Sequence, residues 1–322
     1  MNPYIGHPWQ IYGIEEHRLI GGKGDGMRLL QVRNGKGLEM TVSLDRNADI
    51  ARVTIDGMNV SYMSSSGYVA PAYYQNEGLG WLKSFTAGFL TTCGLEAAGS
   101  PCVDDGETLP LHGTIANTPA EHVYWYEADS ELVVCAVIRD EVLFGRKFLM
   151  ERKIRVSLTE NVFYIQDKVT NTSNKTQPLE ILYHMNMGYP MLDEDSIVSV
   201  PGSSVKGRDA HATAHIDSCL KMELPQPDFQ ERCYYFDFES EEGSASIYQP
   251  KYNKGLRISF DRSTLDCFTV WKMMGCRDYV LGLEPGNCYP DGRDVMRQQG
   301  MLKFLEPGES TAFNIRVNFF EK

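Results

Sequence analysis

Two short segments of the sequence each place one ionisable side chain among apolar and turn-forming residues. The first is Tyr183-His184-Met185-Asn186-Met187-Gly188-Tyr189-Pro190, and the second is Gly282-Leu283-Glu284-Pro285-Gly286-Asn287. An imidazole and a carboxylate in such settings can take and give protons at a substrate, as general bases and acids do. We therefore interpret His184 and Glu284 as a candidate acid–base pair.

Each of these side chains follows an apolar run that predicts a buried strand, over residues 179–183 and 279–283. Gly188 and Pro190 follow the histidine and Pro285-Gly286 follows the glutamate, so we expect both groups at strand ends. Taken alone, each has an equal alternative, a backbone-bonded histidine or a solvated turn glutamate. The shared setting, with no Lys or Arg beside the Glu, favours a functional pair.

Other residues are candidates for substrate contacts. His112 precedes Gly113 in the long irregular stretch 109–121, which is typical of a ligand loop, with a structural loop as the alternative. Trp271 could stack on the C–H face of a sugar next to Lys272, or be a core residue beside a lysine with a buried stem. Arg46 and Asp49 precede an apolar strand, where they either pair with each other or reach a ligand.

The elements that must position these residues are predominantly strands. Residues 311–320 alternate apolar and polar side chains, and comparable runs occupy 38–44, 50–55, 132–138, 147–156, 162–169, 244–248 and 256–260. Long helical periodicity and internal repeats are absent. We predict an all-β fold, a large antiparallel β-sandwich, formed as a single domain over residues 1–322 with a long loop at 201–228.

Composition excludes several functions. A formal net charge of -12 and a pI near 5.1 argue against binding to nucleic acid or to an anionic membrane surface. The N-terminus lacks signal-peptide character and no apolar run reaches 18 residues, so we expect a cytoplasmic protein. The eight cysteines have no CxxC spacing, and His211-Ala212-Thr213-Ala214-His215 lacks a catalytic glutamate, so no metal site is predicted.

With these segments in view, the chain resembles the aldose 1-epimerase (galactose mutarotase-like) superfamily, and it looks closest to an uncharacterised epimerase-related branch. The resemblance covers most of the chain. It is carried, in the order of the family, by Asp45-Arg46-Asn47-Ala48-Asp49-Ile50, Thr91-Thr92-Cys93-Gly94-Leu95, Leu111-His112-Gly113, Val169-Thr170-Asn171-Thr172, Tyr183-His184-Met185-Asn186 and Gly282-Leu283-Glu284-Pro285.

The resemblance implies a large antiparallel β-sandwich and a sugar substrate. It implies that His184 protonates the ring oxygen, that Glu284 removes the anomeric hydroxyl proton, and that His112 helps to hold the ring oxygen, without cofactor or metal. Because a nearby carboxylate raises the pKa of a histidine, we expect a raised pKa for His184. Further substrate contacts are expected from Arg46, Asp49, Asn186, Trp271, Lys272, Asn287 and Arg293.

The chain also departs from the better-known aldose epimerases. Thr91-Thr92-Cys93-Gly94 stands where those enzymes carry an Asn-Arg pair, and residues 186–190 replace a phenylalanine-rich run. The sugar is therefore open, and Lys272, Arg46 and Arg293 could serve an anionic group on it.

We expect a sugar mutarotase or epimerase, monomeric or homodimeric, that acts on a small-molecule sugar. The alternatives are a non-catalytic carbohydrate-binding protein and a sugar isomerase or lyase acting at a carbon next to a carbonyl.

Overall fold

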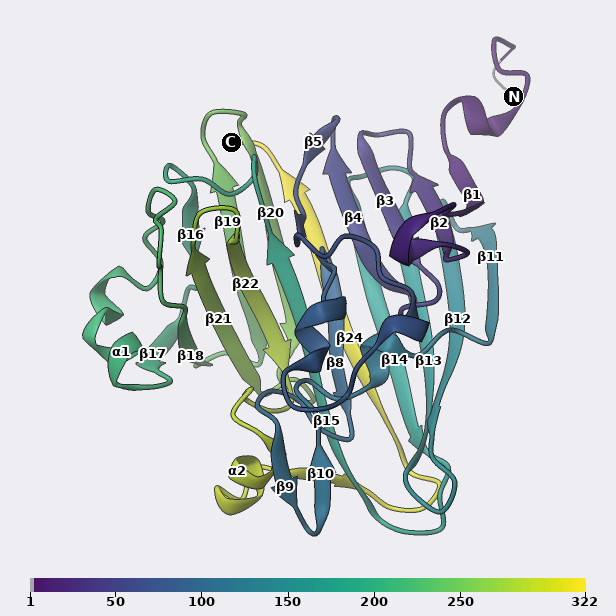
Figure 1. Cartoon of the computed structure of the whole chain (residues 1–322). Coiled ribbons are helices and arrows are strands. Elements are labelled where there is room, and N and C mark those ends of the chain that lie inside the picture. Colours follow the sequence, from purple (N-terminus) through teal and green to yellow (C-terminus); the bar gives the residue numbers. More distant parts are fainter. Residues whose placement is uncertain (1–2) are drawn as a thin grey trace.

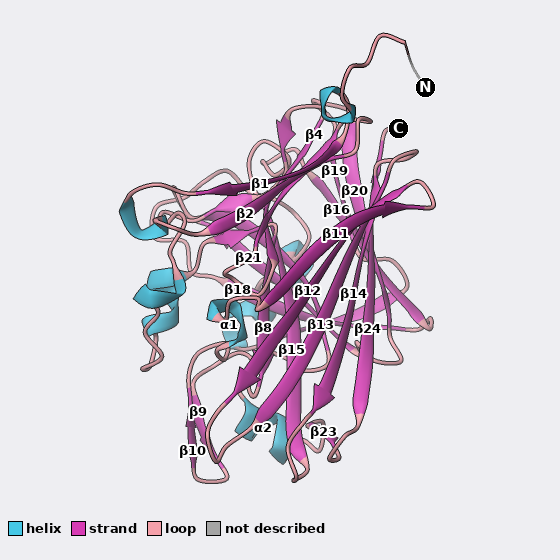
Figure 2. Cartoon of the chain, turned by 90° about the vertical axis from the view of Figure 1, so that its right-hand side faces the viewer, coloured by secondary structure: helices cyan, strands magenta, loops and turns pink. Residues whose placement is uncertain are grey.

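The computed structural model describes residues 3–322, and its largest sheet has eight antiparallel strands (Figure 1). Several of these strands are long and lie side by side in the view of Figure 2. In sheet order they are β11 (His122–Ala128), β12 (Glu131–Glu141), β13 (Lys147–Ser157), β14 (Val162–Asn171), β24 (Ser310–Phe320), β20 (Lys254–Asp261), β19 (Glu242–Gln249) and β16 (Ile197–Ser199).

A second, seven-stranded sheet carries both residues of the candidate pair. Its order is β17 (Ser203–Gly207), β18 (Arg232–Phe238), β21 (Cys267–Met274), β22 (Tyr279–Gly286), β15 (Gln177–Met187) and β23 (Lys303–Leu305), and β8 (Leu90–Leu95) also pairs with β15. The part of β15 that carries His184 therefore has a strand on both sides.

Smaller elements complete the chain. A five-stranded sheet runs through β1 (Gly13–Arg18), β2 (Arg28–Arg33), β3 (Leu38–Ser43), β4 (Asp49–Ile55) and β5 (Met58–Asn59). Two-stranded pairs join β6 (Tyr62–Met63) to β7 (Ala87–Gly88) and β9 (Cys102–Asp104) to β10 (Glu107–Leu109). The helices are short: α1 (Ala210–Ala214), α2 (Arg293–Gln298) and the 3₁₀ turns η1 (Pro8–Gln10), η2 (Gly22–Gly24), η3 (Pro71–Tyr73), η4 (Gly80–Ser84), η5 (Ile115–Asn117) and η6 (Ile216–Ser218).

The architecture confirms the prediction of an all-β antiparallel sandwich. The predicted strands correspond to β3, β4, β12, β13, β14, β19, β20 and β24, because alternating apolar residues pack on one face of each. Within residues 3–322, no helix has the length and apolar character needed to span a membrane.

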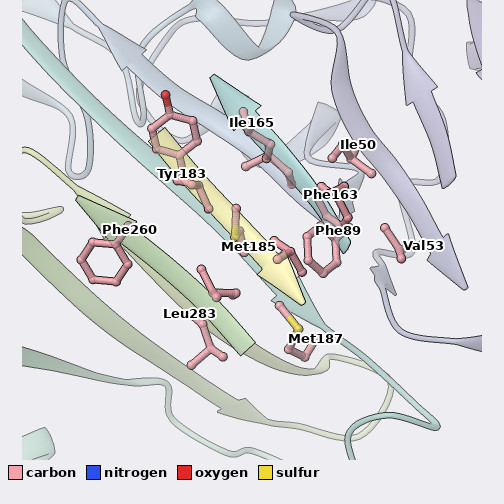
Figure 3. Close-up of a cluster of buried hydrophobic side chains, with 14 of the residues drawn as sticks. Ile50, Val53, Phe89, Phe163, Ile165, Tyr183, Met185, Met187, Phe260 and Leu283 are labelled. Atoms are coloured by element: carbon pink, nitrogen blue, oxygen red, sulfur yellow. The ribbon is translucent and has the colours of Figure 1, made fainter. Parts of the chain in front are cut away.

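The main apolar core is formed by the two large sheets together with the five-stranded sheet, and β15 turns only one of its faces toward it. Figure 3 shows Tyr183, Met185 and Met187 of β15 in this core together with Leu283 of β22. Successive side chains of a strand point to opposite faces, so the residues between them point away from the core. The candidate acid and base are among these residues.

The strand ends differ from the expectation. β15 continues to Met187, three residues beyond His184, and β22 continues through Pro285 to Gly286. Pro285 stays in the sheet opposite Phe268 of β21. The two ionisable groups therefore project from the interior of strands, which fixes their backbone more firmly than strand ends would.

Candidate active site

His184 and Glu284 are cross-strand neighbours on the face that points away from the main core. Met185 pairs with Leu283 and Asn186 with Gly282, and the same antiparallel register sets residue 184 opposite residue 284. His184 Nε2 lies 3.3 Å from Glu284 Oε1. The side chains are almost fully buried, with residue exposures of 5% and 2%. The structure thus brings together two groups that are 100 positions apart in the chain.

Gly282 provides the space that the carboxylate occupies. A Cβ atom at this position would lie 2.2 Å from Glu284 Oε1 and 3.1 Å from Trp271 Cβ. Residues 282 and 284 lie on the same face of β22, so the carboxylate folds back over the glycine. A side chain at 282 would have to displace the oxygen that faces His184.

A cavity of about 350 Å³ opens onto this pair. Its floor comes from β15, β18, β21 and β22, and its walls come from irregular segments around residues 79–85, 99–101 and 111–112. The lining residues are Leu79, Trp81, Leu82, Phe85, Gly99, Ser100, Pro101, Leu111, His112, His184, Arg208, Glu231, Cys233, Trp271, Glu284 and Pro290. A volume of this size falls within the range of small-molecule sites.

Aromatic rings surround the imidazole of His184. The ring centroids of Trp271, Phe85 and His112 lie 5.1, 5.3 and 5.7 Å from it, and Trp81 packs 4.6 Å from His112. The indole Nε1 of Trp271 donates to Glu231 Oε2 at 2.8 Å, which holds the indole in place. Apolar faces beside polar groups are suited to a sugar, whose C–H and hydroxyl surfaces alternate.

A hydrogen bond from the main chain determines which ring nitrogen of neutral His112 carries the proton. The main-chain N–H of Gly99 donates to His112 Nδ1 at 3.2 Å, so the ring proton of the neutral imidazole resides on Nε2. Burial lowers the pKa of His112 to about 3, with smaller contributions from His184 and Arg208. His112 is therefore a neutral hydrogen-bond donor at physiological pH rather than an acid that carries a charge.

Burial also dominates the protonation of the central pair. It lowers the pKa of His184 to about 4, and it raises the pKa of Glu284 well above its ordinary range, with Glu231 adding to this rise and Arg208 opposing it. The expectation of a raised histidine pKa was wrong, because desolvation of the imidazolium outweighs any attraction from the neighbouring carboxyl group. A proton shared by the pair therefore resides on Glu284 rather than on His184.

Two charged residues at the cavity were not identified from the sequence. Arg208 follows β17 and Glu231 precedes β18, and their closest approach is 3.4 Å. Both lie at the edges of irregular stretches without periodicity, so sequence alone carried no signal for them. Arg208 is the cation that lines this cavity, whereas the three cations expected from the sequence lie elsewhere.

Those three cations have structural partners. Arg46 donates to the main-chain carbonyls of Ala116, Val69 and Ser84. Lys272 Nζ donates to two carbonyls, of Ser218 and Lys221, and to Glu223 at 2.6 Å. Arg293 pairs with Asp104 and Glu107 and donates to the carbonyl of Glu96. Buried cations require such partners, and none of the three lines the cavity, so their substrate contacts stay predictions without support from the geometry.

The remaining three expected contacts also lie outside the cavity lining. Asp49 accepts from Arg152 and from Thr92, which ties β4 to β8 and β13. Asn287 bonds the main chain of β15 through both ends of its amide, at Ile181 N and Leu179 O. Asn186 donates to the carbonyl of His184 at 2.9 Å. Of the residues predicted to contact substrate, only His112 and Trp271 line the cavity.

Among residues 3–322, no group of three or more His, Cys, Asp or Glu side chains is arranged to hold a metal ion. The side chains that line the cavity are suited to proton transfer, by His184 and Glu284, and to hydrogen bonding, by His112, Arg208 and Glu231.

Known structures share this architecture. That of a "putative aldose 1-epimerase" from Klebsiella pneumoniae subsp. pneumoniae MGH 78578 matches with a TM-score of 0.90 and 28% identity, over 97% of this chain and 84% of that one. A galactose mutarotase-like protein from Clostridium acetobutylicum (TM-score 0.71, 14% identity, 97% and 100% covered) and galactose 1-epimerase from Lactobacillus acidophilus NCFM (0.63, 13%, 96% and 99%) share the fold.

Comparison of the amino-acid sequence identifies a family but no curated relative. No curated protein sequence matches this chain. The profile described as "Domain of unknown function (DUF4432)" matches residues 24–319. The chain therefore belongs to the DUF4432 family, an uncharacterised branch of the aldose 1-epimerase and galactose mutarotase-like superfamily.

Proposed function

We propose that this protein is a sugar mutarotase or epimerase that interconverts the anomers of a sugar by acid–base ring opening. The observation that carries the proposal is the contact of His184 Nε2 with Glu284 Oε1, 3.3 Å apart in a cavity of monosaccharide size. The solved relatives named as epimerases and mutarotases support the same reaction class.

The reaction needs one group that takes a proton and one that gives a proton at the same time. The base removes the anomeric O–H proton, the bond from the anomeric carbon to the ring oxygen breaks, and the acid protonates the ring oxygen. Rotation about the bond between the carbonyl carbon and its neighbour then allows closure from the other face, with the roles exchanged. Ring opening takes one proton from the sugar and gives one proton to it. A pair that holds one proton in total can therefore complete the cycle without a further proton donor or acceptor.

Without substrate, the cavity favours the state in which Glu284 carries that proton and His184 is neutral, because burial raises the pKa of Glu284 and lowers the pKa of His184. Transfer of the proton from Oε1 to Nε2 would give the carboxylate and imidazolium that the family resemblance assigns as base and acid. Both assignments occur in turn during a reversible mutarotation, so either state can begin the cycle.

The surrounding residues would orient the ring. The face of Trp271 offers a stacking surface, His112 Nε2–H offers a donor, and Arg208 with Glu231 offers a donor and an acceptor for hydroxyl or anionic substituents. This set suits a single sugar ring held edge-on to the acid–base pair.

Exchange NMR of anomeric interconversion would test the proposal. The panel should include neutral aldoses, ketoses, sugar phosphates and uronic acids, with wild type, His184→Ala and Glu284→Gln. We expect acceleration of at least one sugar by wild type and a loss of about 10²- to 10⁴-fold in each variant, the range for a positioned acid or base.

Matched control variants are available on β1. His17 and Glu16 are exposed, so His17→Ala and Glu16→Gln should keep the wild-type rate. Binding of a sugar without acceleration of any anomeric exchange would contradict the proposal and favour a carbohydrate-binding protein. Acceleration that survives both site variants would place the chemistry elsewhere.

A further inference from the structure

Three buried polar atoms at the acid–base pair lack hydrogen-bond partners among residues 3–322. Oε1 of Glu284 faces Nε2 of His184, and the other two are Nδ1 of His184 and Oδ1 of Asn186. Buried polar atoms in folded proteins nearly always have a partner, so the last two call for a physical reason. An imidazole nitrogen can donate and an amide oxygen accepts, so these two atoms are complementary.

The strand places the two side chains next to each other. Residues 184 and 186 are two apart on β15 and therefore share a face. Asn186 Nδ2 donates to the carbonyl of His184 at 2.9 Å, which fixes one end of the amide and leaves Oδ1 as the end without a partner. Across the sheet, Asn186 faces Gly282, over which the carboxyl group of Glu284 folds back with Oε1 toward Nε2 of His184.

The ring neighbours of the imidazole offer no acceptor for Nδ1. Phe85 has no polar atom, the indole nitrogen of Trp271 is a donor already used by Glu231, and His112 Nδ1 accepts from Gly99. Glu284 faces the opposite ring nitrogen, Nε2. Thr91, opposite His184 on β8, donates its hydroxyl to the Ala87 carbonyl. The amide oxygen of Asn186 is the acceptor on the same strand face that has no other partner.

We propose that Asn186 is a positioning residue, whose Oδ1 accepts the Nδ1 proton of His184 and thereby makes Nε2 the nitrogen that exchanges protons with Glu284 and substrate. This inference rests on the proposed mutarotation for its kinetic consequence, although the tautomer itself is a property of the free protein. It assigns Asn186 a role through His184 in place of the substrate contact expected from the sequence.

The proton balance follows from this tautomer. Neutral His184 carries its proton on Nδ1 and has a lone pair on Nε2. When Nε2 takes a proton, the O–H bond of the Glu284 carboxyl breaks and an N–H bond forms, which leaves carboxylate and imidazolium with no change in net charge. The imidazolium then has an acceptor at each nitrogen, and the Asn186 contact raises the pKa of His184 against the larger effect of burial.

¹⁵N NMR of histidine-labelled protein would report the tautomer without any substrate, with His184→Ala used to assign the signal. Wild type should show the Nδ1–H form. Asn186→Leu, which keeps the branched shape in a larger side chain but lacks an acceptor, should shift the ring toward Nε2–H and lower kcat at least about tenfold with little change in KM, a loss typical of orienting partners. Asn186→Asp retains the acceptor, so it should restore Nδ1–H and move the acidic limb of the pH profile upward.

An Nε2–H tautomer in wild type would overturn the inference, and so would an unchanged tautomer and kcat in Asn186→Leu. If Asn186→Leu does not fold, the wild-type spectrum and Asn186→Asp still decide the outcome. If wild type accelerates no sugar, the proposed function fails while the tautomer measurement still tests Asn186, so the two failures are distinguishable.

Discussion

Replacement of Gly282 by alanine should abolish most of the activity while leaving the fold intact. The added Cβ would lie 2.2 Å from Glu284 Oε1, whereas ordinary contact begins near 3.4 Å, so the oxygen must move by about 1.2 Å, the difference between the two. Misplacement of a reacting group by about 1 Å costs on the order of 10²-fold in rate. We therefore expect kcat to fall about 10²-fold.

The stability of the Gly282→Ala variant should change much less. The closest atom to the new methyl group is the end of a flexible side chain, and the backbone of Gly282 is not in the left-handed region. Overpacking against Trp271 Cβ costs on the order of 1 kcal/mol, and the loss of glycine flexibility in the unfolded chain offsets part of it. Urea unfolding should therefore give a free energy within about 1 kcal/mol of wild type.

Two comparisons make the measurement decisive. Gly275→Ala is a matched control, because its Cβ would come close to the flexible end of Met273 and make ordinary contacts with Asp278, away from the cavity, and it should retain full activity. A double variant, Gly282→Ala with Glu284→Gln, should be no slower than Glu284→Gln alone, since coupled positions are not additive. A folded Gly282→Ala protein with activity within about threefold of wild type would refute the assignment of Oε1 as a reacting atom.

Three further outcomes are expected. The rate should fall below about pH 4, where neutral His184 becomes imidazolium, and should fall again at higher pH as Glu284 ionises at its raised pKa; an acidic limb near 6.5 would contradict this. Because the folded-state pKa of Glu284 is raised, the stability that its protonated form contributes is complete below about pH 4.3 and is lost as pH rises toward the folded-state pKa. In urea unfolding at pH 5, 6 and 7, the free energy of unfolding of wild type should therefore fall by up to about 1.4 kcal/mol per pH unit more than that of Glu284→Gln. Arg152→Met should destabilise by about 3–5 kcal/mol, since it leaves Asp49 and Asp167 buried without their cation; a loss below 1 kcal/mol in the same assay would be inconsistent with that role.

The acid and base could be predicted because each stands alone among apolar residues. Alternation along residues 179–187 already separates His184 and Asn186 from Tyr183 and Met185 on opposite faces. The register that sets residue 184 opposite residue 284 depends on strands far apart in sequence, and no local pattern encodes it. The sequence therefore indicated which groups could react, while the sheet determined that they meet.

Charged residues were harder to place, for a physical reason. A sequence shows that Arg46, Lys272 and Arg293 carry charge but not which partner neutralises it, and burial forces each to find carbonyls or carboxylates. Arg208 lies just after β17, in a stretch whose polarity predicts a loop, and only the folded chain brings it to the cavity beside Glu231.

The stability of the fold and the assembly of the site both depend on the register between β15 and β22. A slip of one residue in either strand would turn His184 or Glu284 into the apolar core and expose Met185 or Leu283 in the cavity. Desolvated polar groups would make such mispaired molecules unstable, so they would be removed by unfolding rather than persist as inactive protein. In any preparation, the fraction of molecules with an assembled His184–Glu284 pair should therefore equal the fraction that is folded.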